Sequence, residues 1–121
     1  MSEQTNPEPQ NPALIHANLR QLAAALREAD HLAPETQQSL ASLLDELGQE
    51  LNSTGLASAN TAHLAEAVSE VARSLHEQRS AVSLDAARNQ LEEAAAKAEV
   101  EAPVATGVVY RFIDVLSSIG I

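Results

Sequence analysis

The chain has no cysteine and no tryptophan, and its only aromatic residues are Tyr110 and Phe112. The lack of cysteine excludes disulfide bonds, thiolate metal ligands and a cysteine nucleophile. With so few aromatic side chains, the core has to be built from Leu, Val, Ile and Ala, and Ala is the best helix former. The composition therefore favours an all-α protein.

Basic residues are also scarce. The chain has 7 Lys and Arg against 17 Asp and Glu, which gives a formal net charge of −10. Phosphate backbones and anionic membranes attract Lys and Arg, so this charge opposes binding to either. We expect neither nucleic acid nor a membrane as partner.

Long apolar runs are missing as well. No segment is long and apolar enough to span a bilayer, and the N-terminal stretch MSEQTNPEPQNP has neither the basic start nor the apolar run of a signal peptide. We therefore expect a cytoplasmic protein. A chain of 121 residues suits a single domain.

The N-terminal segment, residues 1–10, is rich in Pro, Gln and Glu and has no apolar period. This composition is typical of a disordered tail. Asn11 followed by Pro12 then favours a helix start, since Asn caps the first turn and Pro fits the first helical position. The domain is expected over 11–121, with its first helix at about 12–30.

A second helix is expected to begin at Pro34, which restricts Ala33 to extended conformations. The short connection before it predicts an antiparallel helical hairpin. This helix is expected to stop in the stretch NSTG, where Asn52 or Gly55 takes a left-handed cap.

Residues 56–102 contain no Gly or Pro, but the phase of the apolar positions argues against one long helix. One helix face is defined by Leu64, Val68, Val71 and Leu75. If the same helix continued, Leu84, Leu91 and Ala98 would not lie on that face. We expect two helices, at about 60–78 and 83–101, with Ser83 as the cap of the second.

The last helix is expected to start at Pro103 and to run to about Ile119. Gly120 stands where a residue of positive φ ends a helix, and Ile121 stands where an apolar side chain folds back onto the last turn. The C-terminal stretch SIGI is therefore interpreted as a helix cap that packs on the core.

The first and last helices carry apolar arcs that cover about half of their circumference. Such arcs are wider than one neighbouring helix covers, so we expect self-association, with a dimer favoured. The alternative is that both helices sit between two neighbours in a monomer. The residues expected to form the core and the subunit contact are Leu19, Leu22, Leu26, Val108, Phe112, Leu116 and Ile119.

Candidate chemical sites are weak. The step Glu28-x-x-His31 has the spacing used in di-iron helical bundles, which need a second copy that this chain lacks. Asp85, Glu92 and Glu99 form a row on one side of a helix, and seven residues rise about 10.5 Å, too far for one metal or one acid–base pair. We expect no enzyme activity, no catalytic or metal-binding residues and no cofactor.

Residues 91–121, LEEAAAKAEVEAPVATGVVYRFIDVLSSIGI, resemble the C-terminal half of a family of small bacterial proteins, domain of unknown function 4404. That family has a helix with an acidic middle, a His-Pro step and an apolar helix with Ile/Val-Asp-x-Leu that ends in Met/Ile-Gly-Ile. The matching positions are Pro103, Ile113, Asp114, Leu116, Gly120 and Ile121. The hairpin with Pro34 and Glu35 also resembles the family's first half.

The chain departs from the family at Ala98 and Ala102, where the family usually has Phe and His, and it carries an extra segment at about 56–80. The resemblance implies a small helical bacterial protein and supplies no catalytic residues.

The sequence thus predicts an all-α bundle of four to five helices, with a helical hairpin in its N-terminal half and an amphipathic C-terminal helix. As function, we expect a non-enzymatic, self-associating protein interaction module with coiled-coil-like packing. The alternative is an acidic regulatory module that binds a basic protein, with an affinity that falls as salt rises.

Overall fold

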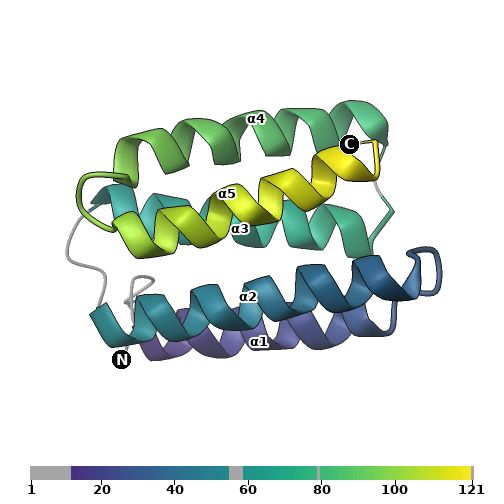
Figure 1. Ribbon diagram of the computed structural model, residues 1–121, viewed down its shortest axis with the longest axis horizontal. Helices are drawn as coiled ribbons and strands as arrows, with labels where there is room; N and C mark the ends of the chain where they lie inside the picture. Colours follow the sequence, from purple (N-terminus) through teal and green to yellow (C-terminus); the bar gives the residue numbers. More distant parts are fainter. Residues whose placement is uncertain (1–11, 55–58, 79, 121) are drawn as a thin grey trace, which may run out of the picture.

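The computed structural model describes residues 12–54, 59–78 and 80–120, and this part of the chain forms five α-helices and no strand. The helices are α1 (Pro12–Arg27), α2 (Pro34–Thr54), α3 (Ala59–His76), α4 (Ala81–Ala98) and α5 (Pro103–Ser118). Figure 1 shows them as a bundle of roughly parallel and antiparallel rods. The prediction of a small all-α bundle is confirmed.

Proline stands at three of the helix starts. α1 begins at Pro12, α2 at Pro34 and α5 at Pro103, as predicted, because proline tolerates the first helical position and keeps the preceding residue out of the helix. At the start of α5, Ala102 has no side chain to cap the helix, and its carbonyl accepts from both the amide and the hydroxyl of Thr106.

The break between α3 and α4 also exists, but its cap is not the predicted one. Ser80, in extended conformation, precedes α4, and its Oγ accepts from the amide of Ser83 at 3.2 Å. Ser83 therefore lies in the first turn instead of capping it. α3 ends at His76, and Gln78, two residues further on, has a φ of 55° in the left-handed region that often follows a helix end.

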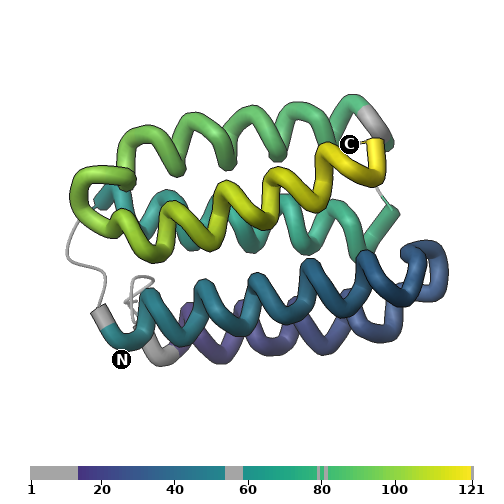
Figure 2. The backbone as a smooth tube through the Cα atoms, in the orientation of Figure 1, coloured from purple at the N-terminus to yellow at the C-terminus, as the bar shows by residue number. Residues whose placement is uncertain are grey.

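The helices pack in a ring in which each has two main neighbours. α1 lies between α2 and α3, α2 between α1 and α5, and α4 between α3 and α5. Figure 2 traces the antiparallel hairpin of α1 and α2, confirming that prediction, and shows α4 along the opposite edge of the bundle from α1. α4 thus contacts the bundle with one face only.

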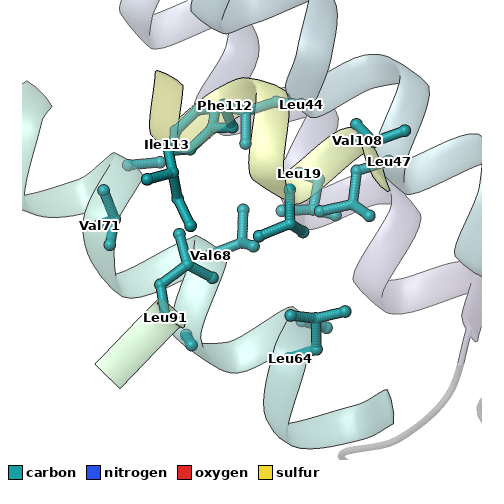
Figure 3. Close-up of a cluster of buried hydrophobic side chains, with 14 of the residues drawn as sticks. Leu19, Leu44, Leu47, Leu64, Val68, Val71, Leu91, Val108, Phe112 and Ile113 are labelled. Carbon is teal, nitrogen blue, oxygen red and sulfur yellow. The ribbon is translucent and has the colours of Figure 1, made fainter. Parts of the chain in front are cut away.

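The most enclosed helix is α3, which buries residues around most of its circumference. Those residues include small side chains such as Ala67 and Ser74 as well as Leu64 and Val68. In Figure 3, Val68 and Val71 of α3 lie in the same cluster as Phe112 and Ile113 of α5 and Leu91 of α4. One continuous core therefore joins the hairpin to the three later helices.

The C-terminal cap is described up to Gly120, which has a φ of 90° and donates its amide to the carbonyl of Ser117. The positive φ agrees with the predicted helix-ending role of this glycine. The expected fold-back of Ile121, the caps at Asn11 and Gly55 and the tail at 1–10 lie outside the described residues.

Candidate functional site

The outer face of α4 carries apolar residues where a solvent-facing surface is normally polar. Val82 is 80% exposed and Val100, two residues beyond the helix, is 92% exposed. We call the exposed positions at steps of four and three residues the outer stripe of α4. It consists of Val82, Ala86, Asn89, Glu93, Ala96 and Val100.

The opposite face of α4 explains why the stripe points away from the bundle. Ala87, Leu91, Ala94, Ala95 and Ala98 are buried, and α4 packs on α3 and α5 with them. A helix advances about 100° per residue, so the outer stripe lies on the other side. Of the five helices, α4 has the least contrast between its two faces, because alanine occurs on both.

An acidic row runs along one edge of the outer stripe. It consists of Asp85, Glu92 and Glu99, of which Asp85 and Glu99 are exposed and Glu92 is partly buried. Glu92 pairs with Arg88 at 3.5 Å, and on the other edge Glu93 pairs with Lys97 at 4.0 Å. Residues 81–101 hold five acidic side chains and two basic ones, so the surface around the stripe is acidic.

Basic side chains elsewhere are held by acidic ones. Arg27 of α1 pairs with Asp45 at 3.0 Å, and Arg111 of α5 pairs with Glu46 at 2.9 Å, so two adjacent acidic residues of α2 bind two neighbouring helices. On α3, Arg73 pairs with Glu70. These pairs are solvent-exposed and each contributes about 0.2–1 kcal/mol. These ion pairs neutralise the positive charges involved, so the excess of acidic side chains determines the charge of the surface.

The seven residues predicted for the core and the subunit contact lie mostly inside the bundle. Five are buried: Leu19, Leu26, Val108, Phe112 and Leu116. Leu22 is partly buried, and Ile119 is 37% exposed at the end of α5.

The five buried side chains cannot touch a second copy while the chain is folded. Two neighbouring helices each cover most of the apolar arcs of α1 and α5, but Leu14 and Val104 stay 61% exposed. Self-association through the accessible part of these arcs, which includes Leu22 and Ile119, stays a prediction.

Grooves lie between several pairs of helices. The groove between α1 and α2 has a volume of about 280 Å³ and is lined by His16, Arg20, Asp45 and Gln49. The groove between α1 and α3 has a volume of about 400 Å³, and in it the side-chain amide of Asn18 donates to Ser69 Oγ at 3.3 Å. The groove between α2 and α5 has a volume of about 410 Å³ and a floor of Leu43 and Val115. The described residues that line the α1–α3 and α2–α5 grooves include no histidine, and those that line the α1–α2 groove include no serine. None of these three grooves therefore places a serine beside a histidine that could act as its base.

His31 has a structural role that the sequence did not reveal. Its Nε2 lies 2.8 Å from the carbonyl oxygen of Leu75, in the last turn of α3. The ring thereby ties the connection between α1 and α2 to the end of α3, a contact between residues 44 positions apart. Glu28, the other member of the Glu-x-x-His step, is exposed.

Within 12–54, 59–78 and 80–120, no three His, Asp or Glu side chains come together as a metal site would require. The search of the same residues found no helix with the length and apolar character needed to cross a membrane.

The sequence model of a family described as domain of unknown function 4404 (DUF4404) matches residues 43–121. The chain belongs to the DUF4404 family. The match begins within α2 and so leaves out α1, and its range includes 56–80, the segment expected to be extra. Comparison with curated proteins and with solved structures gave no match.

The DUF4404 range contains all of α4 and α5, and hence the whole outer stripe and acidic row. The sequence carried a signal for the stripe, namely the four-three spacing of Val82, Ala86 and their successors. Leu84, Leu91 and Ala98 give the stronger apolar pattern and predict the buried face, and the alanines on the other side form a pattern too weak to stand out beside it.

Proposed function

We propose that this DUF4404 protein is a non-enzymatic interaction module that binds a basic protein partner through its acidic surface. The observation that carries the proposal is the outer face of α4, where exposed valines lie beside an acidic row. Apolar residues in contact with a partner provide affinity, while surrounding charges favour association and select the partner.

The charge distribution supports a basic partner over a neutral one. The chain carries a net charge of −10, and ion pairs with acidic residues already hold Arg27, Arg73, Arg88, Lys97 and Arg111. An excess of one charge increases the association rate with a partner of the opposite charge, and salt screens this effect.

Self-association is the other candidate, and it has less support, because most of the apolar residues of the α1 and α5 arcs are buried inside one chain, although Leu14 and Val104 are each 61% exposed. The mass of the full chain in solution, measured by light scattering behind a sizing column, is expected to be that of one chain. A dimer at micromolar concentration would favour self-association instead.

The full chain, immobilised and exposed to a lysate of its source organism, tests the proposal. We expect it to retain proteins of basic isoelectric point at about 0.05 M salt and to release them at about 0.5 M, where the Debye length falls to a few ångströms. Retention that does not depend on salt, or retention of acidic proteins only, would contradict the proposal.

A further inference from the structure

We propose that the outer stripe of α4 is the docking surface for an amphipathic helix with a basic edge. This inference rests on the proposed function and adds the site and the shape of the partner. An exposed stripe at steps of four and three residues is the pattern by which one helix packs along another.

The dimensions of the stripe suit a helix of about four turns or slightly more. Val82 and Ala96, the first and last stripe residues within α4, are fourteen positions apart, which corresponds to about 21 Å along a helix, and Val100 lies in the turn that follows. Between the two valines, Ala86 and Ala96 are small and exposed, so the axis of a second helix can approach closely. The valines at the two ends then pack against larger apolar side chains of the partner.

The middle of the stripe is polar and sets a preference for the partner's residues. Asn89 and Glu93 are exposed and lie one turn apart. Glu93 pairs with Lys97 on its own helix at 4.0 Å. A carboxylate accepts more than one hydrogen bond, so a Lys or Arg of the partner can also bind Glu93, whereas an apolar residue opposite it would remove water from the carboxylate without replacing the lost hydrogen bonds.

The acidic row rules against a second copy of this chain as the occupant. In a parallel pair of α4 helices, equivalent positions face each other, so Glu93 would meet Glu93 of the other copy. In an antiparallel pair, the edge that carries Asp85, Glu92 and Glu99 would face the same acidic edge. Like charges oppose both arrangements, and a helix with Lys or Arg along one edge meets no such repulsion.

Binding of a synthetic peptide to the full chain tests this inference. The probe is a fluorescein-labelled helical peptide of about 21 residues, with Leu and Ala at the four-three positions and Lys and Arg beside them. Fluorescence anisotropy gives its Kd. The stripe variant is V82S/V100S, and the matched control is L14S/V104S, which changes two apolar residues that are each 61% exposed and lie outside α4.

We expect V82S/V100S to weaken peptide binding about tenfold or more and L14S/V104S to change it less than about twofold. A second pair of variants separates the acidic row from the general charge. D85N/E92Q/E99Q should raise the Kd and flatten its salt dependence, and E28Q/D30N/D114N, with the same change in net charge, should have a much smaller effect. Circular dichroism confirms that each variant is folded.

Three outcomes would overturn the docking surface: equal effects of stripe and control variants, no binding of the peptide to the unmodified chain, or conversion of a dimer to a monomer by V82S/V100S. The last would make a second copy the occupant. The proposed function is judged separately, by salt-dependent retention of basic proteins, and it stands if those proteins bind elsewhere on the surface.

Discussion

Replacement of Gly48 by alanine tests how closely α1 and α2 approach each other. Gly48 is buried in α2, and a Cβ atom added there would lie 2.9 Å from Cδ2 of His16 on α1. Its distances to Leu19 Cβ, 3.5 Å, and to His16 Cα, 3.6 Å, are ordinary contacts. The ring of His16 is therefore the one group that has to move.

The size of the effect follows from opposing terms. Alanine is favoured over glycine inside a helix by about 1 kcal/mol, and a buried methyl group adds about 0.8 kcal/mol. Moving the His16 ring off its preferred rotamer costs about 0.5–1.5 kcal/mol. We expect G48A to raise the free energy of unfolding by about 0.3–1.3 kcal/mol.

Urea denaturation followed by circular dichroism measures this change, since the chain has no tryptophan for fluorescence. The same substitution made in an H16A background should stabilise the protein by about 0.5–1.5 kcal/mol more, because the ring is absent. A loss above about 1 kcal/mol that H16A does not relieve would refute the reasoning, because the backbone of α1 would then be the obstacle.

Three further predictions concern stability. Phe112 is 2% exposed, so F112A should lower the free energy of unfolding by about 3–5 kcal/mol through lost burial and a cavity; a loss below about 1 kcal/mol would contradict its place in the core. Gln78 has a φ of 55°, where glycine meets no Cβ penalty, so Q78G should raise Tm; an unchanged or lower Tm would argue against that conformation. Ser80 caps α4, so S80A should cost about 0.5–2 kcal/mol while S83A costs less, and the reverse order would restore Ser83 as the cap.

Sequence reasoning located the helices well where single residues decide the backbone. Pro34 and Pro103 mark helix starts because their rings fix φ and restrict the residue before them. The break between α3 and α4 followed from apolar phase alone. The cap of α4 did not, because Ser80 and Ser83 are chemically equal, and only the extended backbone at Ser80 distinguishes them.

The order of burial among the helices was harder to predict. The broad apolar arcs of α1 and α5 predicted that these two helices would be the most buried, yet α3 buries the largest part of its surface. Its buried set includes Ser69 and Ser74, which a pattern of large apolar residues does not count. Small residues let neighbouring helices approach from several sides, so burial there depends on tertiary packing instead of local periodicity.

The same difficulty applies to the candidate site. Alanine occurs on both sides of α4, so hydrophobicity alone does not say which side faces the bundle. Leu91 decides it, because a large side chain fills space between α3 and α5 that alanine would leave empty. Only once that side is assigned do Val82 and Val100 become exposed residues in need of an explanation.

The most direct test of the account is a map of the peptide contact on the full chain. Amide signals of the ¹⁵N-labelled protein, followed by NMR during titration with the basic helical peptide, report which residues the peptide approaches. We predict shifts concentrated at 82–100 on the exposed side of α4, with α1 and the α2–α5 groove unchanged. Shifts spread evenly over acidic residues, or concentrated on another helix, would contradict the assignment of the outer stripe as the binding surface.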